Sequence, residues 1–401
     1  MAPTFKLIAL LCITVFIIIG VFQFSPSFNN NNNNNIDQQQ VDVIEKAEGE
    51  NDLISSKEQV KLEPTIFISL ASYRDAMCSD TINYIYKNAK HPEYIYVGVV
   101  DQGAEKIDKI FNDTVEHGYP NSYCYHSLDI PKEWVDEHIR FKSMTSEESK
   151  GPTLARFWAS KLYKKETYYM QIDSHMRFIK HWDVHVIDDH WKLTRVEGVE
   201  IGRGGVPKGI LTHYPLPYDH DSSGLPKDDQ THVPNLCKGI FNAEGLMTFN
   251  SYILAATEVP KECPFLAAGF FFGTAEFLST VPYDPHLPNM FEGEEILHTV
   301  RLWVNGYRFF APTMNFCYHF YIRKDQPKFW EDVSEYRVGV RQSVDRAKYI
   351  LGLDHPHDLS DPKYYDINDY DIKNKSIIQQ YWKTYDLDPI AKTHDFNKWC
   401  R

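Results

Sequence analysis

The chain lacks the excess of basic residues that a general nucleic-acid-binding protein needs. It has 42 Lys and Arg against 55 Asp and Glu among 401 residues, and its formal net charge is −13. A surface of this sign repels phosphates, although a local basic pocket can still hold one nucleotide. The seven cysteines also lack any Cys-x-x-Cys spacing. We therefore expect neither a nucleic-acid partner nor a structural zinc site.

One long apolar run stands at the N-terminus. Residues 7–22 are apolar apart from Thr14, and extension to residue 24 gives about the 17–25 residues that cross a bilayer. Lys6 precedes the run, and positive flanks stay in the cytoplasm. The pattern predicts a cytoplasmic tail at 1–6, a transmembrane signal-anchor at 7–24 and translocation of the rest. A cleaved signal peptide is the alternative, but the run exceeds the roughly 7–15 residues of a signal core and no A-x-A site follows it.

A polar, low-complexity segment follows the apolar run. Residues 29–35 are all Asn, and acidic residues outnumber lysines across 25–64. Such a segment buries too little apolar surface to offset its chain entropy. We interpret 25–64 as a disordered stem and 65–401 as the folded domain.

The remaining cysteines and two glycosylation sequons fit a lumenal domain. Cys12 lies in the apolar run, and the other six follow it. In an oxidising lumen these six can form up to three disulfides, whose pairing the sequence leaves open. Asn112-Asp113-Thr114 and Asn374-Lys375-Ser376 are acceptor sequons, which also arise often by chance.

The folded part is predicted to begin with a β-α-β unit. Apolar, β-branched runs at 66–71 and 94–100 indicate buried strands, and 80–89 can form a helix between them. This order favours an α/β fold with a parallel sheet. Ligands of such sheets bind beyond the carboxyl ends of the strands. The polar residues expected there are Ser72, Arg74, Asp75 and Asp101.

A second helix and strand lead into the strongest candidate motif. Gly151-Pro152 opens a helix, with Pro at its first position, and 168–172 indicates a strand. Residues 201–240 are rich in Gly, Pro and Asp and predict a long irregular loop or insert. The chain after Tyr321 is charged and aromatic, which predicts partly helical structure.

Asp173-Ser174-His175 follows the strand directly. Alternate strand residues share a face, so the carboxylate and the imidazole would point the same way. A carboxylate oxygen with a neutral imidazole nitrogen suits Mn²⁺, although an ordinary strand end can carry the same triplet. His181 and His185 have the spacing of a zinc pair, but Trp182 stands where a zincin has Glu.

Four blocks of sequence together resemble a known enzyme family. They are GPTLARFWASKLYKKETYYMQIDSH (151–175), AAGFFFGTAEFLSTVPYDP (267–285), FEGEEILHTVRLWVNGYRFFAP (291–312) and CYHFYIR (317–323). The order of these blocks resembles the retaining polypeptide GalNAc-transferases. Over roughly 65–330 the chain is more similar to the polypeptide α-N-acetylglucosaminyltransferases, in which ASYRD (71–75) and QIDSHMRF (171–178) recur. The resemblance implies a GT-A-type, Rossmann-like nucleotide-sugar-binding fold.

The resemblance also implies roles for individual residues. Asp173, His175 and His319 correspond to the protein ligands of a divalent metal, Mn²⁺. Glu294 and Arg156 correspond to catalytic residues. The residues implied to bind the nucleotide sugar are Ser72, Arg74, Asp75, Asp101, Arg156, Gly269 and Gly273.

The chain departs from the GalNAc-transferase pattern in two places. FEGEE stands where those enzymes have a Trp-Gly-Gly-Glu-type sequence, which leaves GlcNAc against GalNAc open. No lectin domain fits in the remaining C-terminal residues, so the catalytic domain would choose the acceptor itself. Glu292, Glu294 and Glu295 also allow a two-carboxylate glycosidase or an ordinary acidic helix start.

The resemblance implies a Golgi enzyme, single-pass and type II, with a lumenal catalytic domain. It would move GlcNAc from UDP-GlcNAc to Ser or Thr hydroxyls of secretory polypeptides, with retention and with Mn²⁺. A hydroxyproline acceptor or a UDP-GalNAc donor is an alternative within this class. A catalytically silent, membrane-anchored lectin is an alternative outside it.

Overall fold

The computed structural model describes residues 64–401 except 104–106, 112–113, 119–121, 220–223, 227–229, 323–325, 334, 354–356 and 398. The described residues belong to a compact unit that spans Val60–Arg401. The tail, the anchor and almost all of the stem predicted at 1–6, 7–24 and 25–64 lie outside the described residues. Among the described residues, no helix is both long and apolar enough to span a bilayer.

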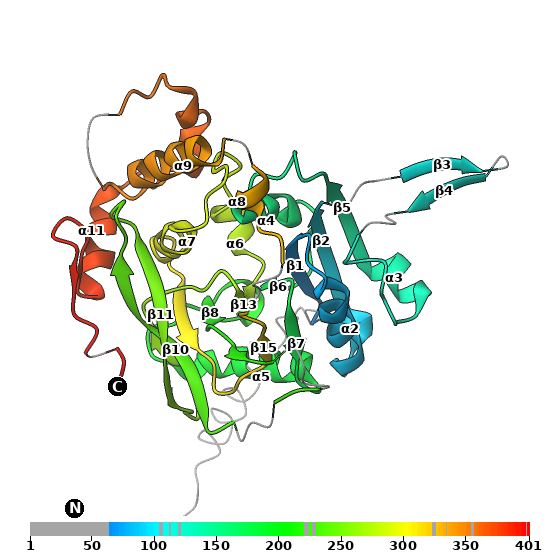
Figure 1. Ribbon diagram of the computed structural model, residues 1–401. Helices are drawn as coiled ribbons and strands as arrows, with labels where there is room; N and C mark the ends of the chain where they lie inside the picture. Colours follow the sequence, from blue (N-terminus) through cyan, green and yellow to red (C-terminus); the bar gives the residue numbers. More distant parts are fainter. Residues whose placement is uncertain are drawn as a thin grey trace, which may run out of the picture. The chain divides into compact units, whose positions relative to one another are not determined.

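A mixed eight-stranded sheet forms the centre of this unit (Figure 1). Its strands, in spatial order, are β12 (Lys261–Cys263), β14 (Arg308–Ala311), β8 (Gly209–Thr212), β13 (Phe270–Thr274), β6 (Tyr168–Asp173), β1 (Ile66–Tyr73), β2 (Ile95–Gln102) and β5 (Ile139–Met144). The β6-β1-β2-β5 half is parallel, β14 pairs with β8 in parallel, and β13 and β12 run antiparallel to their neighbours.

Helices cover the sheet, and short helices and turns connect its strands. The helices are α2 (Cys78–Asn88), α3 (Lys132–His138), α4 (Pro152–Ser160), α5 (Trp182–Lys192), α6 (Phe277–Thr280), α7 (Glu294–Trp303), α8 (Phe329–Asp332), α9 (Tyr336–Ile350), α10 (Ile367–Tyr370) and α11 (Lys375–Thr384). The 3-10 turns are η1 (Pro92–Tyr94), η2 (Leu193–Arg195), η3 (Arg203–Gly205) and η4 (Pro362–Tyr364).

The β-α-β prediction is confirmed. Strand β1, helix α2 and strand β2 follow one another, and β1 pairs with β2 in parallel, with Ser72 opposite Asp101. Strand β6 lies parallel on the other side of β1, with Ala71 opposite Asp173. The carboxyl ends of these three strands therefore meet at one edge of the sheet, where a ligand site is expected.

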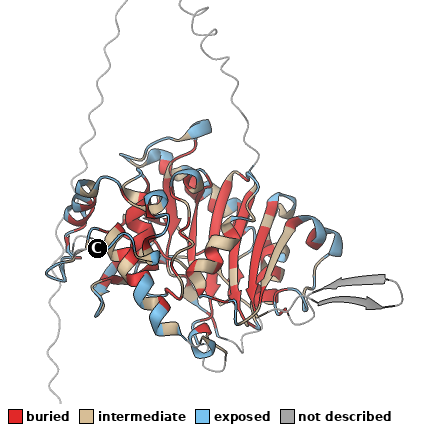
Figure 2. Ribbon diagram, turned by 90° about the horizontal axis from the view of Figure 1, so that it is seen from above, coloured by how far each residue is buried: buried red, intermediate tan, exposed pale blue. Residues whose placement is uncertain are grey.

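The sheet is buried on both faces because its strands carry apolar residues at nearly every position. Phe67, Tyr169 and Phe271 pack into a core with α7, α9 and α11. Their neighbours Ile68 and Met170 pack into a second core with α2 and α5. Successive strand residues point to opposite faces, so continuous apolar runs are what a sheet between two helical layers requires. Figure 2 shows most of the central strands buried, with exposed residues on the surrounding helices and loops.

The expectation of an irregular loop at 201–240 is wrong. This stretch contains β8, which lies in the interior of the sheet between β14 and β13, and all but the last residue of the long strand β10 (His232–Phe241). Strand β8 has only four residues and follows a Gly- and Pro-rich turn. A run this short carries no readable periodicity, so only its pairing with distant strands defines it.

A small three-stranded sheet brings distant parts of the chain together. Strand β15 (Cys317–His319) runs antiparallel to β7 (Met176–Phe178) and parallel to β9 (Leu216–Pro217). The register places His319 opposite Met176. Two-stranded ribbons complete the fold: β10 with β11 (Met247–Ala255), β3 (Ile107–Phe111) with β4 (Thr114–Gly118), and β16 (Leu387–Asp388) with β17 (Thr393–His394).

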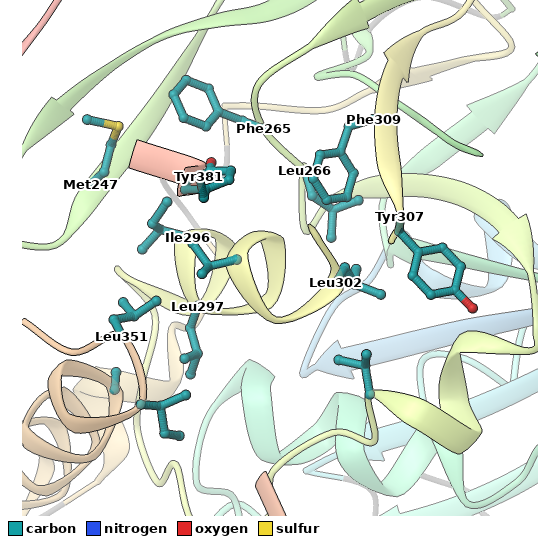
Figure 3. Close-up of a cluster of buried hydrophobic side chains, with 14 of the residues drawn as sticks. Met247, Phe265, Leu266, Ile296, Leu297, Leu302, Tyr307, Phe309, Leu351 and Tyr381 are labelled. Atoms are coloured by element: carbon teal, nitrogen blue, oxygen red, sulfur yellow. The ribbon is translucent and has the colours of Figure 1, made fainter. Parts of the chain in front are cut away.

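The C-terminal region packs against the catalytic half instead of forming a separate module. Figure 3 shows Ile296, Leu297 and Leu302 of α7 in one apolar cluster with Tyr381 of α11 and Leu351. The prediction of partly helical structure after Tyr321 is confirmed.

Two disulfides form among the described cysteines. Cys78 bonds Cys124, and Cys237 bonds Cys400 near the C-terminus. Cys263 and Cys317 are buried thiols. The six cysteines expected in the folded part thus form two disulfides, within the expected limit of three.

Candidate active site

A cavity of about 950 Å³ opens at the edge of the sheet where β1, β2 and β6 end. Its walls also include the residues before β13, the first turn of α7, and the segment that leads into α8. The residues that line it include Ala71, Tyr73, Gln102, Arg156, Asp173, His175, Tyr214, Ala268, Gly269, Phe291, Glu294, Glu295, His319, Tyr321, Lys328 and Trp330. The cavity therefore collects charged and aromatic side chains from stretches that lie far apart along the chain.

Asp173, His175 and His319 converge in this cavity. Each offers one ligand atom, and these three atoms lie within 4.8 Å of one another. Oδ2 of Asp173 lies 3.2 Å from Nε2 of His319, and the two imidazole centroids are 4.5 Å apart. Within the described part of the chain, this is the only group of three such side chains placed to hold a metal ion. One oxygen and two nitrogen donors fit a Mn²⁺-type cation.

Backbone pairing holds the three side chains in place. The amide of Asp173 donates to the carbonyl of Gly269 at 3.2 Å, which ties the end of β6 to the start of β13. The amide of Phe320 donates to the carbonyl of His175 at 3.1 Å, next to the β7–β15 pairing. The site therefore depends on hydrogen bonds between segments more than 90 residues apart.

Asp75 orients His175 from behind the cavity. Its side chain is fully buried, and its Oδ2 accepts hydrogen bonds from Nδ1 of His175 at 2.7 Å and from Oγ of Ser174 at 2.6 Å. Its Oδ1 accepts from the amide of Met77 at 3.0 Å. A carboxylate on one imidazole nitrogen fixes the ring and leaves the other nitrogen to bind a metal. The structure thus places Asp75 behind the predicted metal site, and Asp75 is not among the residues that line the cavity.

Arg156 bridges two carboxylates at the cavity wall. Its guanidinium donates to Oδ1 of Asp173 at 3.0 Å and also pairs with Glu294. Burial opposes the charge on Arg156, but Glu294 and Asp173 outweigh it and hold its pKa above the ordinary value. Burial would likewise raise the pKa of Asp173, but the hydrogen bond with His319 and the charge of Arg156 hold it well below its usual range. Arg156, one of the two predicted catalytic residues, therefore contacts the possible metal site of Asp173, His175 and His319, and Glu294, the other, pairs with Arg156.

Two strand-end residues predicted to bind the nucleotide, Ser72 and Asp101, do not line the cavity, whereas the residues that follow them do. Ser72 and Asp101 are buried away from the cavity, while Tyr73 and Gln102, one residue further along each strand, line it. The hydroxyl of Ser122 donates to Oδ2 of Asp101 at 2.5 Å, and burial raises the pKa of Asp101 to about 6. Successive strand side chains point to opposite faces, and a buried strand does not reveal from its sequence which face is which.

Arg74 follows the cavity residue Tyr73 and forms an ion pair with Asp332. Its guanidinium donates to Oδ2 of Asp332 at 2.8 Å, and the hydroxyl of Tyr73 donates to the same oxygen at 2.5 Å. Asp332 is the last residue of α8, so this pair joins the end of β1 to the segment that borders the cavity.

The two glycines differ in position. A Cβ on Gly269 would lie 2.9 Å from Oδ2 of Asp173, so the absence of a side chain keeps the cavity open beside that carboxylate. Gly273 does not line the cavity as predicted. It lies on β13, where a Cβ would lie 3.1 Å from Cγ1 of Ile210, so it allows β13 to pack closely against β8.

Several cavity residues escaped the sequence interpretation. Gln102, Tyr214 and Trp330 lie outside the motifs, Phe291 lies in a motif without a role assigned to it, and Glu295 was noted only as part of an acid cluster. Glu295 accepts hydrogen bonds from the hydroxyl of Tyr214 and the amide of Ala268. Only Glu295 had a signal in the sequence: it is a polar residue next to Glu294, at an expected helix start.

His181 and His185 do not form a zinc pair on one helix. His181 precedes α5 in a left-handed conformation, with φ of 58°, and only His185 lies on the helix. Cys317 is buried in the core and serves as a packing residue there.

A mixed α/β sheet with oxygen and nitrogen donors at its carboxyl edge defines a site that could hold a divalent metal and its ligand, and the comparisons give the family. The family model "Glycosyltransferase (GlcNAc)" matches residues 65–117 and 109–391. The chain belongs to this glycosyltransferase family. No curated protein matches the chain.

Solved structures of low identity are similar to parts of the chain. GalNAc-T7 with UDP, GalNAc and Mn²⁺ is 13% identical over 80% of this chain and 54% of its own, with a TM-score of 0.47. Mannosyltransferase PcManGT from Pyrobaculum calidifontis, with GDP-Man and Mn²⁺, is 11% identical over 85% and 80%, with a TM-score of 0.39. S. aureus TarS 1–349 with UDP-GlcNAc is 13% identical over 80% and 79%, with a TM-score of 0.37. The chain spans about half the length of the GalNAc-T7 chain.

Proposed function

We propose that this glycosyltransferase is a GT-A-type, metal-dependent retaining enzyme that moves GlcNAc from UDP-GlcNAc to Ser or Thr hydroxyls of secretory polypeptides. The observation that carries the proposal is the convergence of Asp173, His175 and His319 beside Arg156 in one cavity. The family match supports GlcNAc as the transferred sugar. The resemblance to polypeptide α-N-acetylglucosaminyltransferases supports the polypeptide acceptor.

The donor atoms of the site fit a divalent cation. Asp173, His175 and His319 would hold it, with Asp75 behind His175. A bound divalent cation neutralises charge on the diphosphate leaving group. The 3.2 Å between Oδ2 of Asp173 and Nε2 of His319 is a spacing at which both atoms can reach one ion.

The chain's own residues arrange the reacting groups. Arg156 provides a buried positive charge next to Asp173 and keeps that carboxylate ionised. Gly269 leaves the space beside Asp173 open for the sugar. In a retaining transfer the acceptor hydroxyl attacks C1 on the face from which UDP leaves. The C1–O bond to UDP breaks, the new C1–O bond forms, and the departing phosphate oxygen takes the proton.

The cavity has the size and the lining for such a donor. Small-molecule sites typically enclose about 300–1,000 Å³ and combine aromatic walls with a few polar groups. The cavity of about 950 Å³ has aromatic residues at its rim, including Phe291 and Trp330, and the charged cluster within it.

We propose the Golgi lumen as the site of action, with the predicted anchor at 7–24 holding the enzyme in the membrane. The Cys78–Cys124 and Cys237–Cys400 disulfides support an oxidising compartment. Protease treatment of sealed vesicles measures this directly. The catalytic domain should be protected until detergent is added, and cleavage without detergent would contradict a lumenal location.

The full chain, purified in detergent, tests the activity. UDP release and sugar transfer are measured with UDP-GlcNAc and UDP-GalNAc, with and without Mn²⁺, on peptides that carry Ser, Thr or hydroxyproline. We expect Mn²⁺-dependent transfer of GlcNAc to Ser or Thr, and none from the Asp173→Asn variant. Sugar binding without UDP release would instead identify a silent lectin, and full activity in EDTA would exclude the metal-dependent mechanism.

A further inference from the structure

A second cavity, of about 480 Å³, is lined by a different set of described residues from the active-site cavity. It lies between the end of α6, the last turn of α7 and residues 368–377, which include the end of α10 and the start of α11. Asn305, Asn368 and Asn374 line it, and their amide groups can hydrogen-bond polar, uncharged parts of a ligand. Its volume is within the roughly 300–1,000 Å³ that small-molecule sites enclose.

Arg301, in the last turn of α7, brings an unpaired charge to this cavity. It lines the cavity and is only 5% exposed. Within the described part of the chain, its guanidinium forms no hydrogen bond and no ion pair. The other described arginines that are buried, Arg156, Arg177 and Arg346, each pair with a carboxylate. A buried charge without a partner is costly, so an anion that reaches Arg301 gains a strong interaction.

The acidic residues near Arg301 are already engaged elsewhere. Asp284 attracts Arg301 most strongly, but it accepts a hydrogen bond from Nε of Arg346 at 2.7 Å, and solvent reaches neither of those two side chains. Asp371 pairs with Lys375. Arg301 and Arg346 therefore share one buried carboxylate, which leaves one positive charge uncompensated. Burial lowers the pKa of Arg301 to about 10, and the nearby acids offset only part of that shift.

The other charged residues of the lining limit the charge of a ligand. Lys373 is a second cation, and Asp369 and Asp371 are two anions. A guanidinium matches both a carboxylate and a phosphate group. A doubly charged phosphate would also meet the two aspartates, which repel it. A single carboxylate on an otherwise polar, uncharged molecule fits this arrangement better.

We infer that this cavity is a second ligand site, in which Arg301 binds the carboxylate of a small, polyhydroxylated organic acid. The amide groups of the lining bind its hydroxyls. The site uses no residue of the active-site cavity, so the inference does not depend on the proposed function. Helix α7 connects the two cavities, because Glu294 in its first turn lines one and Arg301 in its last turn lines the other, about 10 Å further along the helix.

The test is calorimetric titration of the full-length protein in detergent with gluconate, a polyhydroxy monocarboxylate, in a buffer whose only other small anion is chloride. Glucitol has the same carbon chain without the carboxylate, and inorganic phosphate has the higher charge. We expect gluconate to bind more tightly than either. Arg301→Met should weaken gluconate binding about tenfold or more, because it removes the charged hydrogen-bond donor. Saturation with UDP and Mn²⁺ should leave gluconate binding unchanged.

Two further variants complete the design. Asp369→Asn removes one negative charge from the lining and should strengthen gluconate binding several-fold. Arg341→Met makes the same chemical change as Arg301→Met on an exposed arginine of α9 outside the cavity and should change nothing. Asp369→Asn keeps the inference testable if Arg301→Met does not fold.

Thermal unfolding separates a ligand site from a structural role of Arg301. Since the guanidinium has no carboxylate partner to lose, Arg301→Met should unfold at the same or a higher temperature than wild type without gluconate. Gluconate should raise the Tm of wild type but not that of the variant. A large fall in the Tm of Arg301→Met, together with unchanged gluconate affinity in Asp369→Asn, would make Arg301 a structural residue and overturn the site.

The remaining outcomes are equally decisive. No binding of gluconate to wild type, or equal binding to wild type and Arg301→Met, would overturn the inference. Competition between gluconate and UDP would place gluconate in the active-site cavity, with the same consequence. Tighter binding of phosphate or glucitol than of gluconate would overturn the assigned class of ligand. If gluconate binds as expected but the protein transfers no sugar, the proposed function fails while the second site stands.

Discussion

Nδ1 of His175 lies 2.7 Å from Oδ2 of Asp75, a carboxylate that solvent does not reach. Since an ionised carboxylate only accepts hydrogen bonds, Nδ1 must carry the proton, and the opposite nitrogen is left as a metal ligand. The position of Asp75, just after β1, thus determines how the imidazole between β6 and β7 can act.

The first prediction concerns this pair. Asp75→Asn should lower the affinity for Mn²⁺ about 10- to 100-fold, because the amide no longer fixes the tautomer and ring orientation of His175. Titration of the metal-free protein with Mn²⁺, followed by calorimetry, measures the change. Ser174→Ala is the matched control, since it removes the other side-chain donor to Asp75 without touching the imidazole. Equal losses in the two variants would show that Asp75 acts on the loop and not on His175.

The second prediction concerns the buried pair of Arg156 and Glu294. Arg156→Ala leaves Glu294 buried without its cation, so the free energy of unfolding should fall by about 3–5 kcal/mol. The double variant Arg156→Met with Glu294→Leu should recover much of that loss, because it leaves no uncompensated charge between these two positions. Urea unfolding measures both. A double variant as unstable as the single one would mean that Arg156 stabilises the fold mainly through Asp173.

The third prediction concerns pH. Burial raises the pKa of Asp101 from 3.8 to about 6. A raised carboxyl pKa contributes stability that is fully present below the unfolded pKa and is lost as pH rises through 6. The shift of about two units corresponds to about 3 kcal/mol. Asp101→Asn should therefore gain stability relative to wild type by up to about 3 kcal/mol between pH 3.5 and pH 7.5.

Chemical unfolding across this pH range tests the prediction for Asp101. Glu276→Gln, which removes an exposed carboxyl, serves as the control and should follow the wild-type pH profile. A constant difference between Asp101→Asn and wild type at all pH values would show that Asp101 titrates normally in the folded protein.

The fourth prediction concerns Arg74, which follows the cavity residue Tyr73. If Arg74 binds the diphosphate, it must leave Asp332, with which it pairs in this structure. Arg74→Ala should then weaken UDP binding several-fold, and Asp332→Asn should strengthen it by releasing the guanidinium. Calorimetric titration with UDP measures both. Lys87→Ala removes a similarly exposed cation that pairs with Asp129 on the surface and is the control. Unchanged UDP affinity in Arg74→Ala would remove Arg74 from the nucleotide site.

The fifth prediction concerns the disulfide between Cys237 and Cys400. It links β10 to the C-terminus across a sequence separation of 163 residues and helps keep the C-terminal region packed on α7. Replacement of both cysteines by Ala should cost about 2–5 kcal/mol in the free energy of unfolding. Reduction of the wild-type protein should cause at least as large a loss. If the double variant unfolds as wild type does, noncovalent packing of α11 suffices.

Local pattern was sufficient for the first β-α-β unit and for the strand before Asp173. The runs at 66–71 and 168–172 consist mostly of apolar and aromatic residues, so their burial follows from composition. Strand β8 could not be found in this way. Its four residues become a strand only between β13 and β14, and the residues of β14 lie about 100 positions further along the chain.

The candidate site divides in the same way. The types and order of Asp173, His175 and His319 are visible in the sequence, and the family resemblance connects them. The sequence could not show that Tyr73 and Gln102 face the cavity while Ser72 and Asp101 do not. Successive strand residues point to opposite faces of the sheet. Which of two neighbours faces the cavity depends on how both faces pack, and this packing is not visible in the sequence.

The amino-acid sequence by itself determined which chemical groups this glycosyltransferase carries, in what order, and on which local strands and helices they begin. Only the tertiary structure decided which of two adjacent glutamates pairs with Arg156, and whether Asp75 serves a nucleotide or an imidazole. The physical reason is that hydrogen bonds and ion pairs act over about 3 Å, and only the folded sheet brings residues more than 90 positions apart within that distance.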